Sequence, residues 1–225
     1  MTRLASKGKC ILCEASFSKA GMTRHLEACM RRKPAPQMTR AQRRRRNAGS
    51  FHLVVEGRYL PEYWMHLLAP AHTTLADLDD FLRSTWLECC GHLSAFTIEG
   101  TTYTVYPMED YADGDMGVAL RLVLPLRTKF DYEYDFGTTT RLALRAVSEW
   151  EGEAEGKTIQ LLARNDPPRI ECVLCGEPAT QVCTQCIHTG EGWLCTKCAP
   201  EHECGEDMFL PVVNSPRVGM CAYTG

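Results

Sequence analysis

The chain has 225 residues, of which 44% are apolar and 24% charged, a composition that excludes a fibrous or largely disordered protein. No apolar run approaches the roughly 18 to 20 residues of a membrane-spanning helix, and residues 1–10 lack the apolar stretch of a signal peptide. We therefore expect a cytoplasmic protein with no membrane partner.

The formal net charge of −3 conceals an uneven distribution along the chain. Residues 1–50 carry 13 Lys or Arg against two acids, Glu14 and Glu27, which leaves 12 basic and 26 acidic residues for positions 51–225. An asymmetry of this size is typical of a basic end that meets a polyanion. The sequence thus predicts a partner surface near the N-terminus.

Cysteine spacing in residues 1–30 indicates a metal site. Cys10, Cys13, His25 and Cys29 follow the pattern C-x2-C-x11-H-x3-C. A tight turn can present the two nearby thiols, and a histidine and cysteine four residues apart share one helical face, which completes a tetrahedral set. In a reducing cytoplasm such spacing predicts metal ligation and not disulfides. The segment resembles a zinc finger of the two-Cys, His-Cys variety.

Residues 31–50 are predicted to be a basic flexible linker. Positions 31–46 hold eight basic residues, no acids and two prolines, so self-repulsion opposes a packed element. We expect this segment and the finger to bind the phosphates of DNA or RNA without reading bases. A protein partner and a solubilising tail are the alternatives. The expected nucleic-acid-binding residues are Lys19, Arg24, Arg31, Arg32, Lys33, Arg40, Arg43, Arg44, Arg45 and Arg46.

Residues 51–166 have the patterns of a globular domain. Apolar alternation predicts several strands, and a 3.6-residue period predicts one helix over 75–88, capped by Thr74 or Thr73. The expected strands cover 51–57, 64–70, 93–100, 102–107, 130–137, 140–150 and 158–165. We therefore predict an α+β fold, with a mainly antiparallel sheet and one long helix, flanked by small zinc-binding modules at both ends.

Several short motifs in this domain resemble the plasmid pRiA4b ORF-3-like family, whose members are also named as resolvase-like passengers of insertion elements. The motifs are Pro61, Trp64, Pro70, LADLDDF at 75–81, Trp86, HLSAF at 92–96 and YDFG at 134–137. They span about residues 51–150. The resemblance implies an α+β fold with no established activity, in a mobile-element or regulatory context.

One strand of this domain carries three acids in alternation. Asp131, Glu133 and Asp135 are predicted to share one face, where they could bind a metal or act as acid and base with His92 or His66. The alternative is a strand with aromatic side chains in the core and its acids in water, which we favour. The adjacent cysteines at 89 and 90 are interpreted as buried thiols. We expect no enzymatic activity.

Residues 167–225 contain the most specific pattern in the chain, C-x2-C-x7-C-x2-C-x8-C-x2-C-x3-H-x-C. Eight ligands suffice for two closed tetrahedral sites, and the segment has too few large apolar residues to fold by itself. We predict two structural zinc ions here, and about three per chain in all. The predicted ligands are Cys172, Cys175, Cys183, Cys186, Cys195, Cys198, His202 and Cys204.

Two wirings of these ligands are consistent with the spacing. In an interleaved arrangement, which resembles B-box or MYND modules, the first and third C-x2-C pairs share one ion, and the second pair joins His202 and Cys204. In a sequential arrangement the first two pairs share an ion. We favour interleaving because the seven-residue gap between the first two pairs is short for a ribbon-type site. His188 and Cys221 are alternative ligands, and a redox role is a competing hypothesis.

These patterns predict a zinc-binding, nucleic-acid-associated protein that is not an enzyme. A protein–protein adaptor that uses the C-terminal module is the alternative, together with an uncharacterised enzyme that uses the acidic strand.

Overall fold

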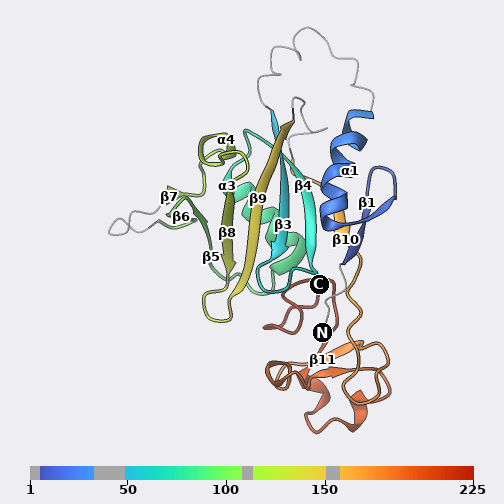
Figure 1. Cartoon of the computed structure of the whole chain (residues 1–225). Coiled ribbons are helices and arrows are strands. Elements are labelled where there is room, and N and C mark those ends of the chain that lie inside the picture. Colours follow the sequence, from blue (N-terminus) through green and yellow to red (C-terminus); the bar gives the residue numbers. More distant parts are fainter. Residues whose placement is uncertain (1–5, 33–48, 108–113, 151–157) are drawn as a thin grey trace.

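The computed structural model describes residues 6–32, 49–107, 114–150 and 158–225, and one large sheet dominates it (Figure 1). The strands of this sheet are β1 (Lys7–Cys10), β2 (Ser16–Ser18), β3 (Ser50–Gly57), β4 (Trp64–Pro70), β5 (Ser94–Ile98), β6 (Thr101–Thr104), β7 (Gly114–Asp115), β8 (Lys129–Tyr134), β9 (Thr140–Trp150) and β10 (Gln160–Asn165). They are arranged in the order β2-β1-β10-β4-β3-β9-β8-β5-β6-β7.

The helices of the described residues are short. They are α1 (Lys19–Arg32), α3 (Leu75–Leu82), the π-helical turn η1 (Arg83–Leu87), α4 (Leu120–Val123) and the 3-10 turns η2 (Ile187–Thr189), η3 (Ala199–Glu201) and η4 (Glu206–Met208). A second, three-stranded sheet contains β12 (Trp193–Leu194), β11 (Gln181–Cys183) and β13 (Phe209–Pro211) in that order.

The expected fold class, a mainly antiparallel sheet with one long helix, is therefore wrong. The protein is mostly β, its ten-stranded sheet is mixed because β6 and β7 pair in parallel, and it has no long helix among the described residues. The helix expected over 75–88 ends as an α-helix at Leu82 and continues as a π turn. The sheet is also wider than expected because β1 pairs with β10, so strands from residues 1–30 and 51–166 belong to one sheet.

Helices α1 and α3 cover opposite faces of the sheet. Strand β4 is buried along its whole length, as expected for a strand packed on both sides. Trp64 and Leu68 lie in a core with Met22 and Leu26 of α1, whereas alternate residues such as Met65 belong to the larger core beneath α3. Figure 1 shows α1 at the side of β10 and β4, and α3 across the other face. The N-terminal segment is thus packed onto the domain.

The start of α3 is fixed by a capping box. Thr74 has extended backbone, its hydroxyl accepts from the backbone N–H of Asp77, and the Asp77 carboxylate accepts from the backbone N–H of Thr74. This pair satisfies two helix-end donors. The following π turn keeps Trp86 buried, with the backbone N–H of Glu88 bonded to the carbonyl of residue 83.

Two histidines form a hydrogen-bonded pair inside the sheet. His52 of β3 and His66 of β4 are fully buried, and His52 Nε2 lies 2.9 Å from His66 Nδ1. Burial, followed by the charge of Arg145, lowers the pKa of His52 to about 4, and burial together with His52 lowers the pKa of His66 to about 3. Both rings are therefore neutral in the folded protein near neutral pH.

The C-terminal residues return to the main domain after the second sheet. The Ser215 hydroxyl donates to the carbonyl of Trp86 at 2.6 Å, and Val218 joins the main core together with Val182 of β11. Arg217 is completely buried, and its Nη2 donates to Asp135 Oδ2 at 2.7 Å. Figure 1 shows the chain end between the large sheet and the module that contains β11. We call residues 212–225 the C-terminal tail.

Candidate metal centres

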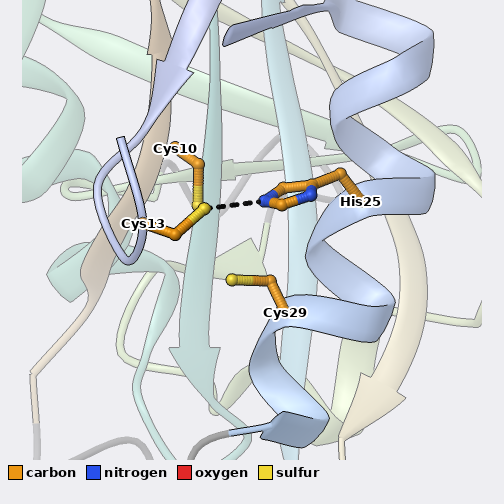
Figure 2. A group of neighbouring side chains, drawn as sticks. All are labelled: Cys10, Cys13, His25 and Cys29. Carbon is orange, nitrogen blue, oxygen red and sulfur yellow. Dashed lines mark hydrogen bonds between the residues drawn. The ribbon is translucent and has the colours of Figure 1, made fainter. Parts of the chain in front are cut away.

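The N-terminal ligand group is built at the junction of β1 and α1. Cys10 ends β1, Cys13 lies in the turn that follows, and His25 and Cys29 lie one turn apart on α1. Figure 2 shows these four side chains converging from the turn and the helix. Their ligand atoms all lie within 4.8 Å of one another, and Cys13 Sγ is 3.2 Å from His25 Nε2. The group could hold a metal ion.

The surroundings of this group restrain its ligands. The backbone N–H of Glu14 donates to the carbonyl of Cys10 at 2.7 Å, closing the turn between the thiols, and Phe17 stacks on the ring of His25 with centroids 4.4 Å apart. Burial, then the hydrogen bond with Cys13, raises the pKa of the Cys29 thiol to about 11. Thiols this close cannot all ionise unless a cation compensates their charge.

The first C-terminal group consists of four cysteines in two turns. Cys172, Cys175, Cys195 and Cys198 have their sulfurs within 4.8 Å of one another, and Cys175 Sγ lies 3.6 Å from Cys195 Sγ. Burial disfavours the Cys172 thiolate, but backbone N–H groups directed at its sulfur, that of Cys195 first, outweigh it and lower the pKa to about 6. Backbone donors aimed at a sulfur stabilise the ionised form that binds metal.

The second C-terminal group combines three thiols with an imidazole. Cys183, Cys186, His202 and Cys204 place one ligand atom each within 4.8 Å of the others, with 3.8 Å between the sulfurs of Cys186 and Cys204. Backbone N–H groups, that of Cys186 foremost, overcome burial and lower the pKa of Cys183 to about 7. His202 Nε2 is buried and has no hydrogen-bond partner among the described residues, so a ring nitrogen of this histidine is available as a ligand.

The sulfur separations match those of a tetrahedral metal site. Thiolates about 2.3 Å from one zinc ion lie about 3.8 Å from each other, and an imidazole nitrogen lies about 3.6 Å from each sulfur. The sulfur pairs in the two C-terminal groups are 3.6 and 3.8 Å apart. A disulfide would require about 2.05 Å, and no cysteine in the described part of the chain forms one.

The C-terminal ligands lie together as the interleaved arrangement predicted. The first and third C-x2-C pairs share one group, and the second pair joins His202 and Cys204. The strand pairing in the second sheet explains this grouping of the ligands, because β11 pairs with β12 on one side and with β13 on the other. His188, named as an alternative ligand, is exposed and lies in none of the groups formed by the described residues.

A fourth group, which the spacing of the sequence did not predict, is formed by Cys89, Cys90, His92 and Cys221. The interpretation of both adjacent cysteines as buried thiols is wrong, because Cys89 is half-buried and Cys90 is exposed. Cys221, considered as a ligand of the C-terminal module, lies with residues 89–92 instead. Three ligand-type residues within four positions were a usable signal, but nothing local joined them to residue 221. With this group, all thirteen cysteines fall into four clusters.

The residues expected to bind nucleic acid differ in their placement. Arg24 and Arg31 are exposed on α1, and Arg32 ends that helix. Lys19 is half-buried and donates to the carboxylate of Glu56. Burial, with the charge of Arg145, lowers the pKa of this lysine. The remaining expected residues lie outside the described part of the chain, namely Lys33, Arg40, Arg43, Arg44, Arg45 and Arg46.

Each acid of the alternating strand is paired with an arginine. Asp131 accepts from Arg58 at 2.8 Å. The Oε1 atom of Glu133 lies 2.6 Å from Nε of Arg141. Asp135 does not share their face, because the strand ends at Tyr134 and Asp135 is buried with φ 65°, where it binds Arg217. The three carboxylates therefore form separate ion pairs and not one cluster.

Comparisons with known proteins assign no family to the chain. No family model matches it, and no curated protein matches it. Among solved structures, it is similar to a protein of unknown function from Methanosarcina mazei Go1, with a TM-score of 0.44 and 19% identity over 48% of this chain and 65% of that one. No helix among the described residues is long and apolar enough to cross a membrane.

Proposed function

We propose that the protein is a zinc-binding, nucleic-acid-associated protein in which metal ions shape both ends of the chain and a basic N-terminal segment binds phosphates. The observation that carries the proposal is the convergence of three predicted ligand sets, each with four ligand atoms within 4.8 Å. Thiolate and imidazole sets of this kind suit zinc, and four protein ligands leave no open position for a substrate. These sites would be structural.

The C-terminal module has a particular need for metal. The small core formed within it contains Leu194 and Ala199 with Cys172 and Cys195, so half of its buried members are ligands. Such a core cannot offset the entropy of ordering the segment. Metal binding, worth roughly 10 to 16 kcal/mol per structural site in peptides, would supply the missing stabilisation.

Nucleic-acid binding rests on charge. Positions 1–50 carry 13 basic residues and two acids, and Arg24 and Arg31 are exposed on the helix that precedes the basic segment. In this proposal the metal site fixes α1 against the sheet, so the segment that follows begins from a rigid base. Its charges would release counterions from a phosphate backbone without reading bases.

Metal content measured by mass spectrometry on the full chain tests the first half of the proposal. We expect at least three zinc ions per chain, one of which is lost in Cys13→Ser and one in Cys186→Ser. Fewer than two ions in the wild type would refute the metal-shaped architecture.

Salt titration of binding to a mixed-sequence DNA duplex and to single-stranded RNA tests the second half. Replacing Arg43, Arg44, Arg45 and Arg46 by Gln should reduce the slope of log affinity against log salt by about 3 to 4. The matched control replaces four basic residues that are exposed in the other domains, Arg121, Arg127, Lys129 and Arg169. Equal slopes in the two variants, or weak binding indifferent to salt, would remove the nucleic-acid role and favour the adaptor alternative.

A further inference from the structure

We propose a fourth metal site, formed by Cys89, Cys90, His92 and Cys221, which takes a zinc-class divalent ion and fastens the C-terminal tail to the main domain. The three ligands at 89–92 lie between η1 and β5, and Cys221 comes from the tail, about 130 residues later. The site is thus distinct from the three groups that the spacing of the sequence predicts.

Three of the four separations agree with four ligands around one ion, and the fourth, between His92 Nε2 and Cys90 Sγ, is shorter than a zinc site requires. The sulfur of Cys90 lies 3.7 Å from that of Cys89 and 3.6 Å from that of Cys221. The Nε2 atom of His92 lies 3.0 Å from Cys90 Sγ and 3.6 Å from Cys221 Sγ. A tetrahedral zinc site requires about 3.8 Å between sulfurs and about 3.6 Å between sulfur and nitrogen.

The side chains behind these ligands form a second layer that orients them. Asp135 Oδ1 lies 3.5 Å from Nδ1 of His92, so the carboxylate faces one ring nitrogen while the other faces the sulfurs. This carboxylate–histidine arrangement is typical of metal-binding imidazoles. Arg217 connects the same layer, because its Nη2 donates both to Asp135 and to the sulfur of Cys89 at 3.4 Å. A buried cation beside a sulfur favours the thiolate.

The backbone of the ligand segments is held in conformations that bring the ligands together. Cys221 has φ 52° and Gly91, between two ligands, has φ 81°. A non-glycine residue is strained in the left-handed region and persists there where surrounding interactions over-determine its conformation. At residue 221, a bond from the sulfur to an ion shared with residues 89–92 would be such an interaction.

The site is more exposed than the other three. Cys90 and Cys221 are exposed and the remaining two ligands half-buried, whereas each other group contains at least one buried cysteine. A chelator therefore reaches this ion more easily. We expect this ion to be the first of the four to dissociate. Its loss should release the tail around residue 221 before the N-terminal segment or the C-terminal module unfolds.

Metal content of the full chain tests the inference. The wild type should contain four zinc ions, and Cys221→Ser and Cys90→Ser three each, while Ala222→Ser, an exposed neighbour of the ligand, keeps four. In the cobalt-substituted protein, thiolate-to-cobalt absorption should fall by about a quarter in Cys221→Ser but not in Ala222→Ser. Urea midpoints close to that of the wild type would show that the variants are folded.

Three ions in the wild type and three in Cys221→Ser would overturn this site and leave the proposed function intact. A Cys90–Cys221 disulfide in protein purified with reductant and zinc would also overturn it. During limiting chelation, maleimide should label Cys90 and Cys221 before Cys10 or Cys183, and the reverse order would contradict the expected lability.

Discussion

Replacing Asp135 by Asn tests whether the buried ion pair with Arg217 holds the C-terminal tail on the domain. Arg217 has no exposed surface, and its Nη2 donates to Asp135 Oδ2 at 2.7 Å. Asn keeps the volume of Asp and tolerates the left-handed φ of 65°, so the substitution removes charge without adding backbone strain. Asp135 Oδ1 also accepts from the backbone N–H groups of Gly137 and Thr138, and an amide oxygen can retain these bonds.

The expected loss is about 3 kcal/mol. Removing one partner of a buried pair costs roughly 3 to 5 kcal/mol because the other charge is left uncompensated. The lower end applies here, since Arg217 keeps the hydroxyl of Thr140 at 3.0 Å and the carbonyl of Thr138 at 3.2 Å, and lies over the ring of Tyr134. The pKa of Asp135 is lowered, as burial is outweighed by Arg217, so the carboxylate is ionised at neutral pH.

Urea unfolding followed by tryptophan fluorescence at pH 7, in excess zinc, measures this loss. With a slope of about 2 kcal/mol/M, the midpoint should fall by about 1.5 M. The matched control is Asp131→Asn on β8, the strand that ends just before Asp135, and its exposed pair with Arg58 should contribute less than about 1 kcal/mol. In a double-mutant cycle with Arg217→Met, a coupling energy below about 0.5 kcal/mol would refute the role assigned to the pair.

Three further changes test other parts of the structure. Burial lowers the pKa of His52 to about 4 and that of His66 to about 3. On acidification these histidines therefore take up protons in the unfolded chain before they do so in the folded protein, and the free energy of unfolding should decrease as the pH drops below about 6.5. At pH 5 the two histidines together lower the free energy of unfolding by about 4 kcal/mol. A variant with Phe at both positions should therefore lose about 4 kcal/mol less stability than the wild type between pH 7 and pH 5. An equal loss in the two proteins would argue against the buried pair. Gly219→Ala should lower the free energy of unfolding by about 1 to 2 kcal/mol, and by more than Gly190→Ala does. Both glycines have a positive φ, but only at 219 would the added methyl meet another side chain, 2.3 Å away. Thr74→Ala removes the cap of α3 and should lower the urea-derived unfolding free energy by about 1 kcal/mol, and no change would show that the capping box adds nothing.

The ligand sets that were predictable from sequence are those whose members are close along the chain. The N-terminal group lies within 20 residues, and the C-terminal groups lie within 33, so the spacing of Cys and His carries most of the geometry. The fourth group could not be predicted in this way. Residues 89–92 and 221 meet because the C-terminal tail is bonded to residues 86 and 89, through Ser215 and Arg217.

The errors in the fold have similar causes. Alternation and apolar periodicity located β3, β4, β9 and β10, but pairing between β1 and β10 joins segments about 155 residues apart and leaves no local pattern. The apolar period of α3 continues through Trp86, which suggested a longer α-helix. The π turn at Arg83–Leu87 also buries Trp86, so periodicity alone does not distinguish the two conformations.

The attachment of β1 to β10 makes the first thirty residues a protective cover for the rest of the molecule. Without them, the backbone N–H and C=O groups along one edge of β10 would be unpaired and could bind another chain. The apolar side chains of Trp64, Leu68 and Leu162 would also be exposed to water. A fragment that starts near residue 49 should consequently self-associate during expression. If the N-terminal group holds a metal ion, as proposed, removing that ion should have the same effect, and metal supply would then influence solubility.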